Sequence, residues 1–311
     1  MRVLFAGTPS IAVPSLEALA ASSHEVVGVL TAPDRPSGRG RALRPSAVKS
    51  RASELGLPIL AFDRLGSAAR AEVEALSPEL LACFAYGKIF GPRFLALFAS
   101  GALNVHPSLL PRHRGPAPIP AAILAGDRET GVTVQAVARE TDAGDVYAQE
   151  RIPLTAEETS ESLAQRVAPT GARMLVEVID AIAAGTASAV PQDHSSATHT
   201  SVVRKEDGRI DWTLSAVQID RMVRAYTPWP RAHTTLRGEH LAVLASQPVP
   251  HGGGGRPGTV VRVDTSHGIL VETGNDLLAL RKLQLQSRKP LEWRSFQNGV
   301  PDLVGLVLGG P

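Results

Sequence analysis

The sequence predicts a two-domain protein: an α/β, Rossmann-like domain with a parallel-rich sheet, followed by a small C-terminal β-barrel of the oligonucleotide-binding type. At 311 residues the chain is longer than one typical domain. An apolar strand at residues 3–6, a turn, a helix and a second strand at residues 25–31 follow the order typical of parallel sheets. From about residue 210, five short strand-like runs separated by glycine turns indicate a barrel.

The N-terminal domain alternates between strand and helix patterns. Further strands are predicted at residues 58–60, 80–86, 102–106, 131–137 and 146–153, and helices at residues 10–21, 47–55, 67–76, 92–99, 117–125 and 160–184. Ser10 is placed to cap the first helix, and Pro169 should break or kink the last one. Residues 32–46 lack periodicity and contain three prolines and two glycines, so they predict a long, flexible loop.

A polar, irregular stretch at residues 187–200 indicates a connection between the domains. We place the N-terminal domain at residues 1–189, the linker at residues 190–207 and the C-terminal domain at residues 208–311. Within the last, a helix is predicted at residues 215–223 and strands at residues 233–236, 241–245, 258–263, 268–271 and 277–285.

The amino-acid composition restricts the classes of protein to which the chain can belong. The hydrophobic fraction of 43% is typical of a globular chain that can bury a sizeable core. The sequence contains no secretory signal and no apolar run of membrane-spanning length, so a cytoplasmic location is expected. The one cysteine, Cys83, lies in an apolar run and is expected to fill core space. With no second cysteine or close histidine cluster, no metal site is predicted. The absence of a Gly-x-Gly-x-x-Gly turn argues against NAD.

The charge of the chain is unevenly distributed. The net charge is +2, but residues 204–311 hold 14 Lys/Arg against 10 Asp/Glu, which leaves residues 1–203 with a negative balance. Within that negative part, residues 34–51 carry six Lys/Arg and a single acidic residue, Asp34. A solvated loop is the ordinary interpretation of such a run. Because the cations are concentrated beside glycines and the second domain is also positive, we favour a polyanionic partner.

A polar pair lies at the end of the predicted strand at residues 102–106. Asn104 and His106 alternate with apolar residues, so both side chains project from one face. Asp142 follows in a predicted turn. An amide, an imidazole and a carboxylate suit a reaction in which an acyl carbon is attacked, an oxyanion forms and a proton moves. The alternatives are that Asn104 and His106 only bond the loop, that Asp142 only shapes its turn, or that Asp145 supplies the carboxylate.

The sequence motif around this pair is too long to be explained by chance. Residues 104–112 (Asn-Val-His-Pro-Ser-Leu-Leu-Pro-Arg), then Arg114-Gly115 and Asp142-Ala143-Gly144, resemble the formyltransferase family that uses 10-formyltetrahydrofolate. The resemblance implies a Rossmann-like formyltransferase domain at residues 1–189, with Asn104, His106 and Asp142 as the catalytic residues. It also implies that the folate co-substrate binds at Ser108, Leu109, Leu110, Pro111, Tyr86, Gly87 and Ile89, without a metal.

Residues 5–9, 33–41, 205–212 and 224–230 resemble the branch of this family that formylates the amino group of methionyl initiator tRNA. That branch implies a tRNA-contacting barrel at residues 208–311 and a tRNA-engaging loop. The expected tRNA-binding cations are Arg35, Arg39, Arg41, Arg44 and Lys49, and a monomer is expected. Two alternatives remain: a formyltransferase acting on a small amine, such as an amino sugar or glycinamide ribonucleotide, and a non-catalytic tRNA- or folate-binding module.

Overall fold

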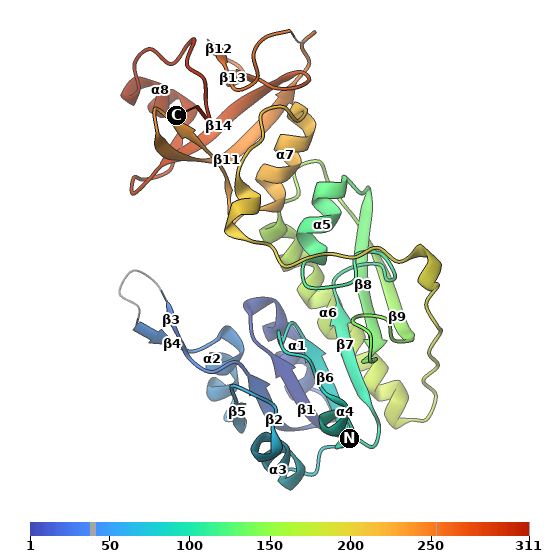
Figure 1. The fold of residues 1–311 in the computed structure, drawn as a ribbon. Coiled ribbons are helices and arrows are strands. Elements are labelled where there is room, and N and C mark those ends of the chain that lie inside the picture. Colours follow the sequence, from blue (N-terminus) through green and yellow to red (C-terminus); the bar gives the residue numbers. More distant parts are fainter. Residues whose placement is uncertain (38–41, 253, 311) are drawn as a thin grey trace. The chain divides into compact units, whose positions relative to one another are not determined.

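In the computed structural model of this chain, residues 1–37, 42–252 and 254–310 are described. The chain forms two compact units (Figure 1). Unit 1 comprises Met1–Pro118, Glu129–Leu154 and Ala164–Ser201. Unit 2 comprises Ile119–Arg128, Thr155–Leu163 and Val202–Pro311. The segment after residue 189, predicted to be a linker, is therefore shared between the two units.

Unit 1 is built on a seven-stranded sheet in the order β5-β2-β1-β6-β7-β8-β9. Its strands are β1 (Arg2–Gly7), β2 (Glu25–Thr31), β5 (Ile59–Ala61), β6 (Leu80–Phe84), β7 (Ala102–His106), β8 (Glu129–Ala136) and β9 (Val146–Pro153). Strands β5 through β7 pair in parallel, whereas β8 pairs antiparallel with both β7 and β9. The predicted parallel-rich α/β sheet is confirmed. Strand β6 is buried at every position, as expected of a strand covered on both faces.

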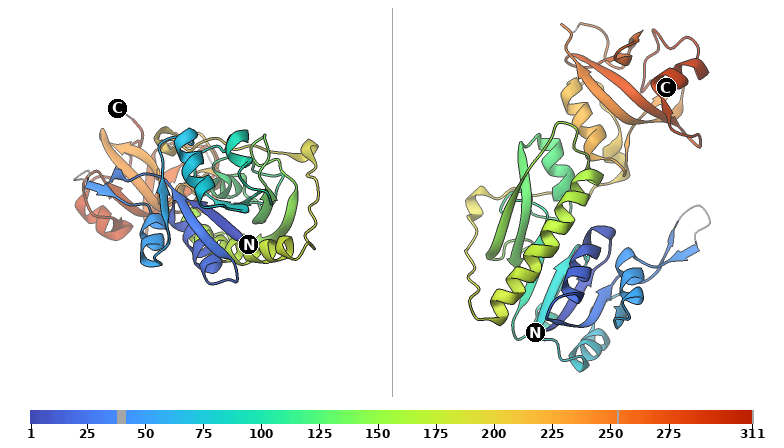
Figure 2. Two further views of the ribbon diagram at one scale, coloured as in Figure 1. Left: turned by 90° about the horizontal axis from the view of Figure 1, so that it is seen from below. Right: turned by 180° about the vertical axis from the view of Figure 1, so that it is seen from behind.

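The helices of unit 1 are α1 (Val13–Ala20), α2 (Ala47–Glu54), α3 (Ser67–Ala75), α4 (Pro92–Leu95) and the part of α6 (Ser160–Ala183) from residue 164. Helix α6 lies against one face of the sheet (Figure 2). At Gly171, an added Cβ would lie 2.8 Å from Cγ1 of Val105 in β7. Glycine therefore lets this helix approach the strand that carries the polar pair.

Three local predictions need correction. Ser10 does not cap α1: it begins a short 3-10 helix, and α1 starts with a proline in its first turn, where no amide hydrogen needs a partner. Helix α6 continues through Pro169 to Ala183, so of the predicted break or kink the break does not occur. The helix predicted at residues 92–99 extends only over Pro92–Leu95.

The predicted loop at residues 32–46 contains a two-stranded hairpin. Strands β3 (Arg35–Ser37) and β4 (Ala42–Arg44) pair antiparallel on either side of residues 38–41, which lie outside the described residues. The hairpin projects from the sheet (Figure 1). Its register places Arg35 directly opposite Arg44.

Unit 2 contains α5 (Pro118–Ala125, from its second residue), α7 (Ala216–Ala225), α8 (Trp293–Gly299) and an antiparallel sheet. The strands are β10 (Ala232–Leu236), β11 (Glu239–Val249), β12 (Val260–Asp264), β13 (Gly268–Glu272), β14 (Leu277–Leu285) and β15 (Leu291–Glu292). The order is β10-β11-β14-β13-β12, with β15 beside β14. Helix α7 begins with a capping box in which Ser215 and Gln218 satisfy each other's backbone amides.

The C-terminal segment joins the two outer strands of this sheet. Beside β12, the amide of Val260 donates to the carbonyl of Leu306 at 2.8 Å. Beside β10, the amide of Gly309 donates to the carbonyl of Thr235 at 2.9 Å. Backbone groups that an open sheet would leave unpaired are satisfied in this way. No helix in the described part of the chain is long and apolar enough to cross a membrane.

Candidate active site

The site lies at the carboxyl end of β7, the edge of a parallel sheet where open α/β proteins bind ligands. Alternation along the strand turns Asn104 and His106 to one side and the buried Val105 to the other. His106 is 4% exposed. The antiparallel register places Gln135 of β8 directly opposite Asn104. A third polar side chain is thereby added to the predicted pair.

Asp142 lies in a turn that folds back onto β8. The amide of Ala136 donates to the carbonyl of Asp145 at 2.9 Å, which closes the turn. Asp142 itself adopts a left-handed conformation with φ of 54°, which aspartate tolerates better than most residues. A Cβ at Gly144 would collide with the carbonyl oxygen of Ala136. The Asp-Ala-Gly sequence therefore fits the turn that brings the carboxylate toward β7.

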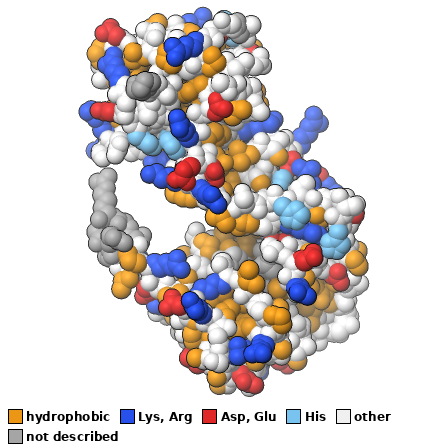
Figure 3. Space-filling model, in the orientation of Figure 1, with side chains coloured by type: hydrophobic (Ala, Val, Ile, Leu, Met, Phe, Trp, Pro, Cys, Tyr) orange, Lys and Arg blue, Asp and Glu red, His pale blue; other side chains and the backbone are white. Residues whose placement is uncertain are grey.

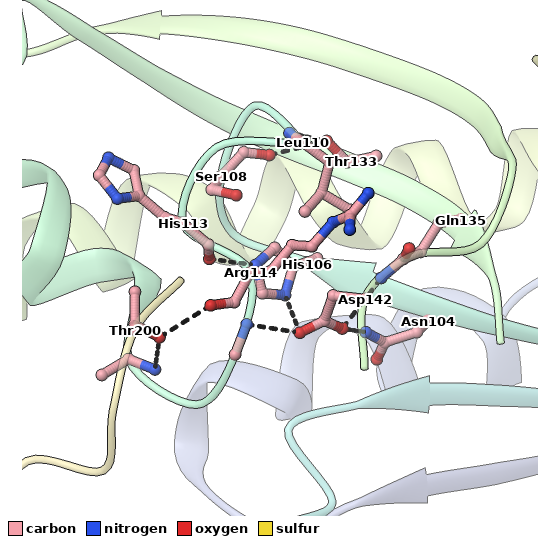
Figure 4. A network of polar contacts seen from close by, with 12 residues as sticks. Asn104, His106, Ser108, Leu110, His113, Arg114, Thr133, Gln135, Asp142 and Thr200 are labelled. Carbon is pink, nitrogen blue, oxygen red and sulfur yellow. Dashed lines mark hydrogen bonds and ion pairs between the residues drawn. The ribbon is translucent and has the colours of Figure 1, made fainter. Parts of the chain in front are cut away.

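The three predicted residues come together at this point (Figure 4). Oδ2 of Asp142 lies 3.6 Å from Nδ1 of His106, and Nδ2 of Asn104 donates to Oδ1 at 3.2 Å. Two further donors hold the carboxylate: the amide of Gly115 reaches Oδ2 at 2.8 Å, and Nε2 of Gln135 reaches Oδ1 at 3.0 Å. With three hydrogen-bond donors and an imidazole around it, this carboxylate is an oriented acceptor.

The partners of His106 define its protonation. Its Nε2 lies 2.9 Å from the backbone carbonyl oxygen of His113. A carbonyl only accepts, so Nε2 carries the hydrogen and Nδ1, facing Asp142, is the nitrogen free to take a proton. Burial lowers the pKa of His106 below its ordinary value of 6.5, and the charge of Asp142 and the His113 carbonyl oppose that shift only in part. At neutral pH the imidazole of His106 is therefore neutral.

The loop at residues 108–111, predicted to bind folate, is anchored to the sheet. Thr133 of β8 donates through its hydroxyl to the carbonyl of Ser108 at 2.7 Å and accepts from the amide of Leu110 at 3.3 Å. Nε2 of Gln149 donates to the carbonyl of Leu110 at 3.0 Å. Leu109 packs over a glycine of β8, where an added Cβ would collide with its side chain. Ser108 and Leu110 are buried, so packing adds to the hydrogen bonds that anchor this loop.

The second predicted folate segment, residues 86–89, divides into a buried part and an exposed part. The ring of Tyr86 belongs to the core and stacks on Phe90 with ring centres 5.4 Å apart. Burial raises the pKa of its hydroxyl to about 12. Gly87 adopts a φ of 83°, and Ile89 is 87% exposed. Within this segment Gly87 and Ile89 are therefore exposed and the tyrosine ring is buried, and the folate-binding role of all three stays a prediction.

The predicted tRNA-binding cations have different surroundings. Arg35 and Arg44 are exposed and face each other across the hairpin. Lys49 forms an ion pair with Asp34 at 2.7 Å. Arg39 and Arg41 lie outside the described residues. On the face shown in Figure 3, Lys and Arg side chains are spread among other residue types.

Sequence reasoning missed several residues that complete the site. Gln135 occurs in an alternating strand, but only the pairing of β8 with β7 shows that it faces Asn104. Gln192, in the predicted linker, bonds to Gln135 and to the turn that carries Asp142. Thr133 anchors the loop after His106. These contacts join distant segments, and no local signal in the sequence marks them. Among the described residues, no group of three or more His, Cys, Asp or Glu could hold a metal ion.

Comparisons with known proteins identify the family. Residues 1–179 match the family described as formyl transferase, and residues 202–301 match its C-terminal domain. Methionyl-tRNA formyltransferase from Treponema denticola is 44% identical over 317 residues, which cover 98% of each chain. The enzyme of the same name from Treponema pallidum strain Nichols is 46% identical over 99% of each chain. The chain belongs to the methionyl-tRNA formyltransferase family. The predicted formyltransferase activity is thereby confirmed.

Solved structures share the fold of this family. A sugar 3N-formyl transferase, WlaRD, solved with dTDP and 5-N-formyl-THF, has a TM-score of 0.65 at 16% identity and covers 93% of this chain and 99% of its own. HypX from Aquifex aeolicus, solved with tetrahydrofolic acid, has a TM-score of 0.63 at 18% identity and covers 95% of this chain and 46% of its own. At these identities the likeness concerns the fold.

Proposed function

We propose that this chain transfers the formyl group of 10-formyltetrahydrofolate to the amino group of methionine on initiator tRNA, with Asn104, His106 and Asp142 acting on the reacting atoms. Membership of the family supplies the reaction. The observation that carries the residue assignment is the convergence of these three side chains from β7 and from the turn between β8 and β9, with Nδ1 of His106 facing the carboxylate at 3.6 Å.

In this proposal His106 and Asp142 move the proton. As the amino nitrogen forms its bond to the formyl carbon, Nδ1 of His106 accepts the proton that the nitrogen loses. The carboxylate of Asp142 stabilises the resulting imidazolium, which then returns the proton to the folate nitrogen as its bond to the formyl carbon breaks. The overall exchange is one N–C bond for another, with no net proton consumed.

Asn104 stabilises the charge that develops on the formyl oxygen. One hydrogen of its Nδ2 is directed to Asp142, and the second has no partner among the described residues. A fixed amide donor whose orientation is set before the reaction costs no reorganisation when the oxyanion forms. The reaction needs no protein nucleophile, because the amino group of the substrate attacks. Burial raises the pKa of the nearby Cys83 thiol to about 12, so this thiol stays protonated.

The remaining binding assignments stay part of this proposal. The anchored loop at residues 108–111 and the exposed part of residues 86–89 would hold the folate. Arg35, Arg39, Arg41 and Arg44 would contact tRNA phosphates, and Lys49 would join them by leaving Asp34. We further propose a cytoplasmic monomer with domain boundaries at residues 1–189 and 208–311 and a linker at residues 190–207.

A formylation assay with charged initiator tRNA, run beside a small amine acceptor, tests the substrate. We expect formyl-methionyl-tRNA as the product and no comparable rate with an amino sugar. His106→Ala should lower kcat by about 100- to 10,000-fold while tRNA binding is retained. A faster reaction with the small amine would favour the alternative formyltransferase. Full function in His106→Ala would favour a binding module.

A further inference from the structure

Gln192 lies between the two regions that match the family, and its side chain is buried beside the site. Its Nε2 lies 2.7 Å from the carbonyl oxygen of Gly144, 2.9 Å from that of Asp142 and 3.2 Å from Oε1 of Gln135. Its Oε1 accepts from Nη2 of Arg114 at 2.7 Å and from Nε at 3.2 Å. One amide from the predicted linker thus holds both the Asp142 turn and β8.

The chemistry of the partners fixes the direction of these bonds. A guanidinium only donates, so the atom of Gln192 that faces Arg114 must be its oxygen. The nitrogen of Gln192 then faces Gln135, whose oxygen accepts and shares the two amide hydrogens with the carbonyls of Gly144 and Asp142. This leaves the nitrogen of Gln135 to donate to Oδ1 of Asp142. One arginine therefore sets the orientation of two successive amides and ends the chain with a donor aimed at the carboxylate.

Arg114 is well placed to act as the fixed end. It is 4% exposed, and its amide donates to the carbonyl of Thr198 at 2.9 Å while its carbonyl accepts from the amide of Thr200 at 2.8 Å. Its Nη2 also lies 3.0 Å from Nδ1 of His194. The structure shows no carboxylate paired with Arg114 among the described residues, so the oxygen of Gln192 is its main acceptor. Breaking this bond would leave a buried charge poorly satisfied.

We propose that Arg114, Gln192 and Gln135 are positioning residues, a chain of hydrogen bonds with fixed direction that holds the Asp142 carboxylate against His106. None of the three contacts the reacting atoms. The inference rests on the proposed role of Asp142. It also gives the segment between the two family regions a part in the reaction, beyond that of joining two domains.

The physical reason lies in the turn that carries Asp142. Gln192 ties two carbonyls of this turn, and Gln135 holds one oxygen of the carboxylate. Without them, only Asn104 and the amide of Gly115 hold the carboxylate, and Oδ2 can shift relative to Nδ1 of His106. A displacement of about 1 Å in such a group can cost on the order of 100-fold in rate.

The pKa of His106 depends on the position of the Asp142 carboxylate and can therefore be used to measure it. The titratable groups that act on it are Asp142, whose charge raises its pKa, and His113, whose charge lowers it. If the carboxylate moves away, the raising effect weakens and the pKa of His106 falls further. A loss of stability elsewhere in the fold would leave this titration unchanged.

The experiment compares the variants Gln192→Met and Gln135→Met with the parent chain. Methionine keeps the size of glutamine but has no amide donor. Gln165→Met is the matched control, because Gln165 is exposed on α6. The His106 Cε1–H resonance, assigned with His106→Gln, is titrated by NMR, and kcat is measured with charged initiator tRNA.

We expect both variants to shift the His106 midpoint to lower pH and to lower kcat by about 10- to 100-fold, with KM for tRNA changed by less than about twofold. The double variant should lose less than the product of the two single losses, because Gln192 acts in part through Gln135. The control should match the parent chain. If Gln192→Met does not fold, Gln135→Met alone carries the test.

An unchanged His106 midpoint in these variants would overturn the inference, whatever happens to kcat. A shifted midpoint with parental kcat would overturn it as a statement about the reaction, provided that Asp142→Asn is inactive. Parental activity in Asp142→Asn would instead show that the proposed function of Asp142 has failed, and the NMR titration would still decide whether the chain of hydrogen bonds positions the carboxylate.

Discussion

The polar side chains at the end of β7 and those in the β3–β4 hairpin have opposite surroundings. At β7, the imidazole of His106 and the carboxylate of Asp142 are surrounded by partners with defined directions. In the hairpin, Arg35 and Arg44 are exposed and stand opposite each other as like charges, an arrangement that weakens a strand pair. Chemistry requires groups held in place before the substrate arrives, whereas binding a polyanion can leave charges to be satisfied by the partner.

The largest effect on kcat is expected from removing the charge of Asp142, whose carboxylate is held by hydrogen-bond donors at the end of β7. Asp142→Asn should lower kcat by about 1,000-fold, because the imidazolium that forms at His106 loses its stabilising partner. Single-turnover formylation measures this step. The His106 titration should move to lower pH, since the carboxylate that raises its pKa is gone. A variant with parental kcat would separate Asp142 from the reaction.

A smaller effect is expected from disturbing the turn alone. Gly144→Ala places a methyl group against the carbonyl of Ala136, so the turn must shift while every catalytic side chain is retained. We expect kcat to fall by about 10- to 100-fold. Gly185→Ala, at an exposed glycine with a φ of 69° and no neighbour within 4 Å, strains the backbone away from the site and so controls for a general loss of stability. Equal losses in the two variants would contradict a role for the Asp142 turn.

Changes in the hairpin should affect binding rather than chemistry. Arg35→Ala and Arg44→Ala are each expected to raise KM for tRNA by about three- to tenfold and to reduce the salt dependence of binding by about one phosphate contact. KM for the folate and kcat should stay at parental values. Arg70→Ala, on α3, is the control for loss of a surface charge. A fall in kcat with unchanged tRNA binding would assign these arginines to the catalytic step.

The smallest effect concerns stability and pH. The lowered pKa of His106 means that the unfolded chain binds a proton at this residue more readily than the folded chain does. Its contribution to stability is therefore present above the ordinary value of 6.5 and is lost as the pH falls below it. His106→Gln, which keeps a donor for the His113 carbonyl, should show a shallower fall of Tm between about pH 7 and pH 5. Parallel Tm curves for the two chains would contradict a neutral, buried His106.

The prediction succeeded where local pattern and local chemistry agree. The apolar run before Asn104 and the alternation through His106 identify a strand and one of its faces. The predicted strand at residues 146–153 matches β9 from its first residue to its last. The prediction failed at Ser10, because a proline follows in the first turn of α1, and at residues 32–46, because the pairing of β3 with β4 outweighed local propensity.

The sequence by itself determined the family, the parallel-rich α/β sheet and the candidate trio, because these depend on motifs and on side-chain periodicity along one segment. Only the tertiary structure decided that Tyr86 belongs to the core, that Lys49 is paired with Asp34 and that Gln135 and Gln192 hold the Asp142 turn. Each of those contacts joins segments whose spacing along the chain carries no signal. Their distances are set by strand register and by the packing of a connecting segment onto the sheet.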